Sequence, residues 1–281
     1  MSDTIGYLGP AGTFCEKAAR RYKGEGKENL MPYRSIREVF GAVEKGDVKS
    51  GIVPIENTYE GAVNQTLDLM TGEHNVYIAG EIIITIRQNL LTHPGVSKRE
   101  IDCILSHSQA LAQCREYLNT HYTGVPLLEV PSTAEAARLV ATSAETWAAI
   151  ATRSAAETYG LQILAADIQD QFNNATRFVV LSKKDAGYVP GCKTSLLIYV
   201  LDRPGALFKV LREFYERNIN LCRIESRPAR TRMGDYLFFI DIEGHRHEDR
   251  VQQALAGVTA LAAVVRVLGS YPTAPPLSEN D

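Results

Sequence analysis

The stretch Asn173-Asn174-Ala175-Thr176-Arg177-Phe178 runs directly into the apolar segment Val179-Val180-Leu181. A loop that enters a rigid strand can aim its two amides, one hydroxyl and one guanidinium at a single point. The guanidinium matches a carboxylate, and the threonine hydroxyl both donates and accepts hydrogen bonds. A polar loop with a surface ion pair explains these residues equally well, so the rest of the chain has to decide.

The chain has 281 residues, of which 45% are apolar and 22% charged, with a formal net charge of −3. This length allows two or three compact units. The charge gives no basic field for nucleic acid or an anionic membrane. We see no signal sequence and no apolar run long enough to span a membrane. Five scattered cysteines without C-x-x-C spacing predict reduced thiols and a cytoplasmic location. His245 and His247 have no third ligand nearby, so no metal site is expected.

Strand-like and helical patterns alternate in the first half, which predicts a mainly parallel sheet covered by helices. The glycine-rich segment Gly9–Phe14 joins the first strand to a helix, with Thr13 as its cap. Its amides suit an anion, although a simple capped turn explains it as well. Glu56-Asn57-Thr58 ends another strand. Ligands bind beyond the carboxyl ends of such strands, so both loops are candidates for one site.

The segment Tyr77–Leu91 reads as a crossing to a second lobe, where the alternation begins again. Ser106-His107-Ser108-Gln109 forms a polar loop there, and Ser132 opens a helix with the Ser-x-x-Glu capping pattern. His107 is either a helix cap or a titrating group. The chain returns through Asp167–Asn174, so the polar loops of both lobes should line one cleft.

The pattern changes after a polar linker. From Thr194 onward it reads as strand, helix, strand, strand, helix, strand, which is the ferredoxin-like βαββαβ arrangement. Asn218–Arg227 is unusually polar for a central strand. We predict a binding or dimerisation module, followed by a proline-containing tail without regular structure.

The residues quoted so far resemble the prephenate dehydratase family over nearly the whole chain. The resemblance rests on ordered motifs: Gly9-Pro10-x-Gly12-Thr13-Phe14, Pro54-Ile55-Glu56-Asn57-Thr58, Ser106-His107-x-Gln109, Ser132-Thr133-Ala134 and Thr176-Arg177-Phe178. The C-terminal unit is similar to an ACT domain, through Gly205-Ala206-Leu207 and Glu225-Ser226-Arg227-Pro228. Ser108 stands where the family more often has Pro, and Thr58 stands where Ser is common.

The resemblance implies an α/β, two-lobed catalytic domain similar to periplasmic binding proteins, with the substrate in the interlobe cleft. The expected limits are residues 1–185 for this domain, with lobe one at about 1–80 plus 174–185 and lobe two at about 81–173. A linker over 186–193, an ACT domain over 194–271 and a tail over 272–281 follow. The resemblance also implies a monofunctional enzyme that forms a homodimer or homotetramer.

The implied reaction converts prephenate to phenylpyruvate, water and carbon dioxide without metal or cofactor, under feedback regulation by L-phenylalanine. In this interpretation Thr176 acts on the departing hydroxyl, with its proton set by Glu56 or a relayed water, and Arg177 binds a carboxylate. The expected substrate contacts are Gly12, Thr13, Glu56, Asn57, Thr58, Ser106, Gln109, Ser132 and Phe178. The expected L-phenylalanine contacts are Gly205, Ala206, Leu207, Asn220, Glu225, Ser226, Arg227 and Pro228.

Three alternatives stay open. Arogenate dehydratase uses the same chemistry on the amino-acid analogue of prephenate. A two-lobed cytoplasmic solute-binding or sensor protein would also suit paired lobes around a cleft. An ACT-type sensor with an inactive first domain is a third, against which the intact Asn57, Gln109, Thr176 and Arg177 argue.

Overall fold

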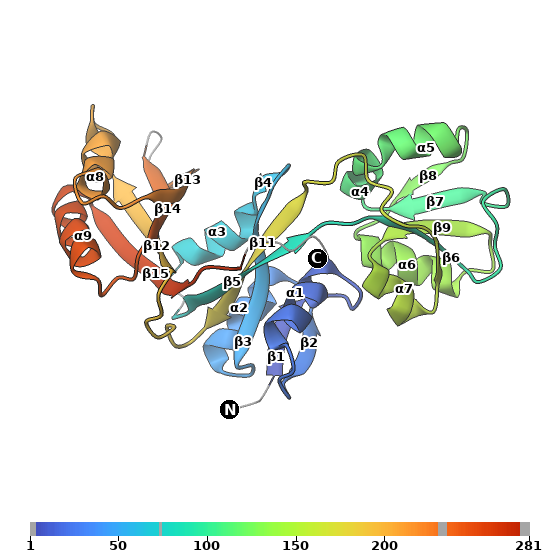
Figure 1. Cartoon of the computed structure of the whole chain (residues 1–281), viewed down its shortest axis with the longest axis horizontal. Helices are drawn as coiled ribbons and strands as arrows, with labels where there is room; N and C mark the ends of the chain where they lie inside the picture. The colour runs from blue at the N-terminus through green and yellow to red at the C-terminus, as the bar shows by residue number, and fades with distance from the viewer. Residues whose placement is uncertain (1–3, 73–74, 230–234, 276–281) are drawn as a thin grey trace.

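The polar stretch around Thr176 opens strand β11 (Ala175–Ser182), which lies inside the sheet of the central unit (Figure 1). The structure is a computed structural model and describes residues 4–72, 75–229 and 235–275. Three units lie in a row: a central lobe, a second lobe on one side and the C-terminal domain on the other. The predicted α/β fold with two lobes and a C-terminal domain is confirmed.

The central lobe has the strand order β2-β1-β3-β11-β5, and the short β4 pairs with β3. β1 runs parallel to β2 and β3, whereas β11 runs antiparallel to both β3 and β5. The sequence predicts a mainly parallel sheet. The sheet is instead mixed, because the returning strand β11 is antiparallel to both of its neighbours. The other elements are β1 (Thr4–Leu8), α1 (Phe14–Lys23), β2 (Asn29–Tyr33), α2 (Ile36–Lys45), β3 (Ser50–Asn57), β4 (Gly61–Ala62), α3 (Asn64–Thr71) and β5 (Tyr77–Thr85).

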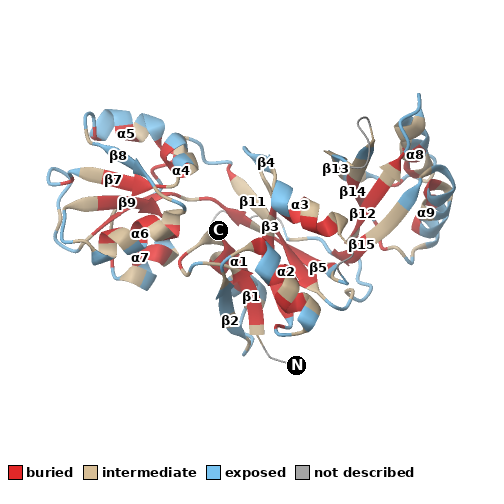
Figure 2. Cartoon of the chain, turned by 180° about the vertical axis from the view of Figure 1, so that it is seen from behind, coloured by how far each residue is buried: buried red, intermediate tan, exposed pale blue. Residues whose placement is uncertain are grey.

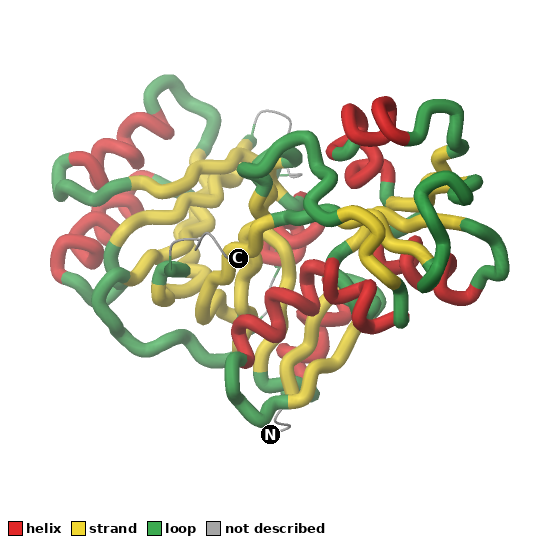
Figure 3. The backbone as a smooth tube through the Cα atoms, turned by 45° about the vertical axis from the view of Figure 1, so that its right-hand side comes forward, coloured by secondary structure: helices red, strands yellow, loops and turns green. Residues whose placement is uncertain are grey.

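The second lobe has the strand order β10-β6-β9-β7-β8, and helices lie on both sides of its strands (Figure 3). Its Ala-rich helix α6 buries Ala134, Ala136, Ala137 and Val140, so this helix packs closely on the sheet. The elements are β6 (Asn89–Thr92), β7 (Cys103–Ser106), α4 (Ser108–Gln113), α5 (Arg115–His121), β8 (Leu127–Glu129), α6 (Thr133–Thr142), β9 (Trp147–Ala151), α7 (Arg153–Tyr159) and β10 (Gln162–Ala165).

Two segments connect the lobes. β5 stays in the central sheet as far as Thr85, five residues beyond the expected limit of about 80, and the chain then passes through 86–88 into β6. It returns through 166–174 to β11. Ile86 N donates to Asn174 O at 2.9 Å, so the two crossings are hydrogen-bonded to each other.

The C-terminal domain has the antiparallel strand order β13-β14-β12-β15, as expected for βαββαβ. β15 ends at Pro272, one residue into the expected tail, and Thr273 N donates to Gly191 O. Residues 276–281 of that tail lie outside the described residues. The elements are β12 (Cys192–Val200), α8 (Ala206–Tyr215), β13 (Leu221–Pro228), β14 (Tyr236–Glu243), α9 (Asp249–Leu261) and β15 (Val264–Pro272).

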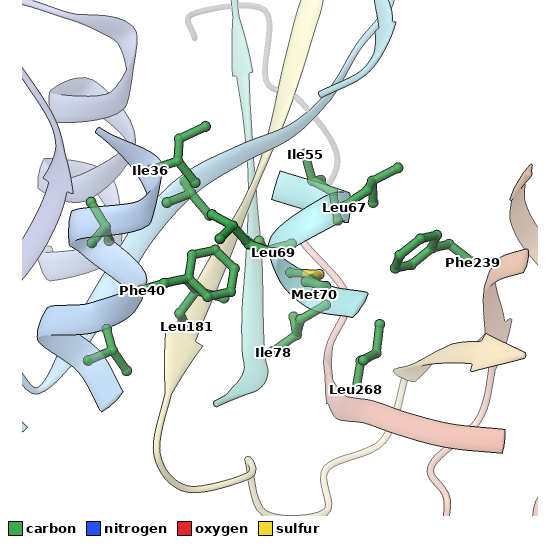
Figure 4. Close-up of a cluster of buried hydrophobic side chains, with 14 of the residues drawn as sticks. Ile36, Phe40, Ile55, Leu67, Leu69, Met70, Ile78, Leu181, Phe239 and Leu268 are labelled. Atoms are coloured by element: carbon green, nitrogen blue, oxygen red, sulfur yellow. The ribbon is translucent and has the colours of Figure 1, made fainter. Parts of the chain in front are cut away.

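One apolar cluster crosses the boundary between the central lobe and the C-terminal domain (Figure 4). Met70 and Ile78 of the central lobe share it with Phe239 and Leu268 of the C-terminal domain, all of them buried. The sheets pack so closely that a Cβ on Gly269 would meet the Ile78 backbone. Figure 2 shows the buried residues running through the strands of both units. Within the described part of the chain, no helix is both long and apolar enough to cross a membrane.

Candidate active site

A cavity of about 330 Å³ lies between the two lobes. Asn57 and Thr176 line it from the central lobe, and Gln109 and Ser132 line it from the second lobe. These four residues stand far apart in the sequence but were all expected at one site. Asn57 and Thr176 meet because β3 and β11 pair side by side, with Thr176 opposite Asn57. Gln109 lies in α4, and Ser132 immediately precedes α6.

The side-chain amide of Asn57 forms a hydrogen bond with the Thr176 hydroxyl. Asn57 Nδ2 donates to Thr176 Oγ1 at 2.9 Å and to Asn174 Oδ1 at 2.9 Å, while Asn57 Oδ1 accepts from the amides of Tyr59 and Glu60. These bonds fix which end of the Asn57 amide faces Thr176. Since Thr176 Oγ1 accepts this bond, its own proton can be donated to a molecule in the cavity.

Four described helices begin at the cavity. The residues at their starts that line it are Phe14 of α1, Val63 before α3, His107 before α4 and Ser132 before α6. A helix N-terminus carries partial positive charge and unpaired N–H groups, so it attracts anions. No Lys or Arg is among the described residues lining the cavity. An anionic ligand would therefore be held by neutral donors and helix ends.

Arg177 does not line the cavity, which corrects the expectation that it binds a substrate carboxylate. Successive side chains of a strand point to opposite faces, so Arg177 faces away from Thr176. Its Nε donates to Glu81 at 2.7 Å, Nη1 to Asp241 at 2.6 Å and Nη2 to Tyr271 at 2.8 Å. Burial alone would lower the pKa of Arg177, but the charges of Asp241 and Glu81 outweigh it and raise the pKa above its ordinary value.

Glu56 lies on the Arg177 side as well. Its carboxylate is 3.2 Å from Arg223 Nε and 3.7 Å from Arg177 Nη1. The expected exchange of a proton between Glu56 and Thr176 therefore has no geometric support. Glu60, four residues further along, does line the cavity and is its one carboxylate among the described lining residues.

Several other expected contacts have structural roles instead. Phe178 is 1% exposed within an apolar core, and the buried Ser106 donates its hydroxyl to Ile150 O at 2.6 Å. Gly12 N donates to Glu16 Oε2, so this amide is not available to an anion. Thr58 Oγ1 bonds the backbone of Ala175. None of these four lines the cavity, because each is engaged within its own part of the fold.

Thr13 caps α1, as expected, by accepting from Glu16 N. The neighbouring Gly12 makes a contact between the lobes: its carbonyl accepts from Thr152 Oγ1 at 2.6 Å. A Cβ on Gly12 would lie 3.0 Å from Ala155 Cα, and its φ of +84° also favours glycine. The glycine-rich loop therefore holds α7 against the central lobe beside the cavity.

The structure adds the cavity residues Gln88 and Gln113, which the sequence interpretation missed, and it places Asn174 of the stretch before β11 there as well. Gln88 Nε2 donates to Gln113 Oε1, whereas Gln88 Oε1 and Asn174 Nδ2 are buried with no hydrogen-bond partner among the described residues. Buried polar atoms are usually paired, so these two are suited to a ligand. Gln113 could have been found, because it follows Gln109 by four residues on one helix face.

His107 also lines the cavity, and its expected role as a helix cap is seen here. Its Nδ1 accepts from Gln109 N at 3.3 Å at the start of α4. Since Nδ1 is the acceptor, the proton of the neutral ring lies on Nε2.

A second cavity, of about 100 Å³, lies where β12 ends and α8 begins. Ala206 and Leu207 line it, and Gly205 turns the chain into α8 with a φ of +76°. The expected partners on and near β13 do not line it. Asn220 donates to Glu243, and Arg227 bonds Asn64 and Asp68 of α3. Glu225, Ser226 and Pro228 are likewise absent from its described lining.

Comparisons with known proteins agree with this architecture. The family model for prephenate dehydratase matches residues 5–186, and that for the ACT domain matches residues 194–259. A bifunctional chorismate mutase/prephenate dehydratase of Aquifex aeolicus is 45% identical over 96% of this chain and 74% of its own.

Solved structures agree on the fold as well. Prephenate dehydratase of Arthrobacter aurescens, in complex with L-Phe, has a TM-score of 0.88 and 35% identity, covering 96% of this chain and 90% of that one. A structure named GqqA and described as a novel type of quorum quenching acylase has a TM-score of 0.88 and 28% identity, covering 97% and 98%. The expected resemblance is confirmed: the chain belongs to the prephenate dehydratase family and carries a C-terminal ACT domain.

Proposed function

We propose that this protein converts prephenate to phenylpyruvate, with loss of carbon dioxide and water. The observation that carries the proposal is the Thr176 hydroxyl, which is oriented by Asn57 and able to donate into a cavity surrounded by helix N-termini. A hydrogen-bond donor is needed where a hydroxide leaves, and positive helix ends suit a ligand with two carboxylates.

In the proposed reaction the bond between the ring and its carboxylate breaks, and its electron pair enters the ring. The carbon–oxygen bond opposite then breaks, and the departing oxygen takes a proton to leave as water. The ring becomes aromatic, so no oxidant or reductant is required. Thr176 donates the hydrogen bond along which the proton moves, and such positioned proton donation contributes about 10²–10⁴ in rate.

A threonine hydroxyl is a weak acid, so another group has to replace the proton. We assign this exchange to Glu60, because it lines the same cavity while Glu56 faces the C-terminal domain. Asn57, Gln109, Gln113 and Ser132 supply neutral hydrogen-bonding groups that orient the substrate.

L-Phenylalanine is the regulator we propose, bound at the cavity beside Gly205, Ala206 and Leu207. β13 is one of the two edge strands of its sheet, so a second copy of the chain can bring Glu225–Pro228 to this cavity. That arrangement favours a homodimer or homotetramer. The five cysteines are free thiols, which supports the cytoplasm as the proposed location.

The test is formation of phenylpyruvate from prephenate, read by ultraviolet absorbance in base, with and without L-phenylalanine. Turnover that responds to L-phenylalanine is expected. Turnover indifferent to L-phenylalanine would remove the regulatory proposal alone. No turnover of prephenate together with turnover of arogenate would make arogenate the substrate, and failure with both would leave ligand binding without catalysis.

A further inference from the structure

Arg177 stands next to Thr176 in the sequence but belongs to a buried ionic network on the other side of the sheet. Its side chain is 11% exposed, and the side chains of Glu81 and Asp241 are 0% and 4% exposed. Glu81 comes from β5 of the central lobe and Asp241 from β14 of the ACT domain. The guanidinium thus joins the two domains one residue from the catalytic hydroxyl.

The ACT domain holds its side of the network rigidly. Ser195 Oγ on β12 bonds Asp241 Oδ1 at 2.5 Å and the Tyr271 hydroxyl at 2.6 Å. Tyr271 lies on β15 and is fully buried. Three ACT strands therefore supply side chains that fix the two groups facing Arg177.

The charges on the central-lobe side are paired too. Glu81 Oε1 accepts from Lys193 Nζ at 2.9 Å and from Ala274 N at 2.9 Å, while its other oxygen accepts from Arg177. Buried charges that are fully paired hold one geometry, and removing one partner leaves the other charge uncompensated. The network can thus form only when the ACT domain and the central lobe hold nearly the same position relative to each other.

The backbone of β11 is irregular at this point. Its pairing with β3 shifts register between Arg177, opposite Glu56, and Phe178, opposite Pro54. Such a bulge breaks the ladder of backbone hydrogen bonds, and proline has no N–H to donate. The side chain of Arg177 supplies an anchor where the ladder to β3 shifts register, while the ladder to β5 continues through Arg177 without a shift.

We propose that Arg177 is a positioning residue: it fixes the start of β11 to the ACT sheet and thereby sets the position of the Thr176 hydroxyl. A movement of the ACT sheet would then shift Arg177, and with it the start of β11 and the Thr176 hydroxyl in the cavity. This inference rests on the role of Thr176 proposed above. Arg177 itself makes no contact with the substrate.

Two conservative variants test the proposal from the ACT side, at residues that do not line the cavity. Tyr271→Phe removes the hydroxyl that accepts from Arg177 while the buried ring stays, and Asp241→Asn removes the charge while the shape stays. The proposal predicts that each lowers kcat about ten- to a hundredfold, since small misplacements of a catalytic group cost that much, and leaves KM within about twofold. Arg177→Lys should show the same pattern.

Arg266→Gln is the matched control. Arg266 Nη1 donates to Gly72 O at 2.6 Å, so it also crosses the domain boundary, but it takes no part in the hydrogen bonds of Arg177 with Glu81, Asp241 and Tyr271. Its kcat should stay within about twofold of wild type if the network, rather than the boundary in general, positions Thr176.

Hydrogen exchange gives a second readout that does not depend on turnover. The peptide containing Ala175–Ser182 should exchange faster in Tyr271→Phe and Asp241→Asn than in wild type and Arg266→Gln. A purely structural role would loosen the ACT domain without changing this peptide. If wild type fails to turn over prephenate, the proposed function fails, yet the exchange experiment still decides the positioning role.

Two results would overturn the inference. One is unchanged kcat and unchanged exchange in a folded Tyr271→Phe protein. The other is an Arg177→Lys variant whose KM rises at least tenfold while kcat is kept, because that pattern belongs to a direct substrate contact.

Discussion

Gly269 on β15 should tolerate no side chain, because it packs against the backbone of β5. A Cβ added there would clash most closely with the carbonyl oxygen of Ile78, and it would lie 2.9 Å from the carbonyl carbon and 3.0 Å from the nitrogen of that residue. Ordinary contacts begin at 3.4 Å, so the carbonyl carbon alone requires a separation of about 0.5 Å (3.4 minus 2.9), and the closer carbonyl oxygen requires more. Backbone cannot rotate away as a side chain can, so the whole boundary has to open.

Overpacking of this kind costs about 1–3 kcal/mol. For a protein of this size each kcal/mol lowers Tm by roughly 2–4 °C, so Gly269→Ala should lose several degrees. kcat should fall as well, because β5 pairs with β11 and places Ile84 opposite Thr176.

Gly257→Ala provides the matched control for the same chemical change. Its added Cβ would meet the carboxylate end of Glu213, a flexible side chain that can move aside. Gly257 lies within α9, where alanine favours the helix by about 1 kcal/mol over glycine. Both variants are compared with wild type by thermal unfolding and by prephenate turnover. A Gly269→Ala protein with wild-type Tm and kcat would refute the packing argument.

Three further results are expected. Thr176→Ala should lower kcat about 10²–10⁴-fold with folding intact, while Thr176→Ser keeps most of it, and equal kcat values for the two variants would exclude the hydroxyl as donor. Glu60→Gln should lower kcat with KM nearly unchanged; unaltered kinetics would rule out its proton exchange. Burial lowers the pKa of His245 below 6.5, so the unfolded chain binds that proton first. The contribution of neutral His245 to the free energy of unfolding is then complete above pH 6.5 and is lost as the pH falls below 6.5. In that pH range the Tm of His245→Gln should change less with pH than the Tm of wild type.

The sequence predicts which residues gather at the cavity better than it predicts which way they point. Thr176 and Arg177 were both expected to face the substrate because the stretch reads as a loop up to Phe178. The strand actually begins at Ala175, so the two side chains face opposite sides of the sheet. A shift of four residues in the start of one strand, from Val179 to Ala175, reverses the role of the arginine.

Burial explains the other differences. Ser106 belongs to a motif whose neighbours His107 and Gln109 do line the cavity, but it ends β7 with its hydroxyl bonded to the β9 backbone. Gln88 lies in a crossing segment that has no periodic pattern, so nothing in the sequence separates it from a linker. The contact of Arg177 with Asp241 joins two domains, and no local pattern predicts it.

The position of β11 between β3 and β5 has a consequence for synthesis on the ribosome. β3 and β5 emerge early, but the strand that completes their sheet follows only after the second lobe has been made. The second lobe is formed by one continuous segment, so we expect it to fold first on the nascent chain. Until Ser182 has emerged, β3 lacks one neighbour and β5 has none in its sheet, so we expect the growing polypeptide to be prone to aggregation in that interval.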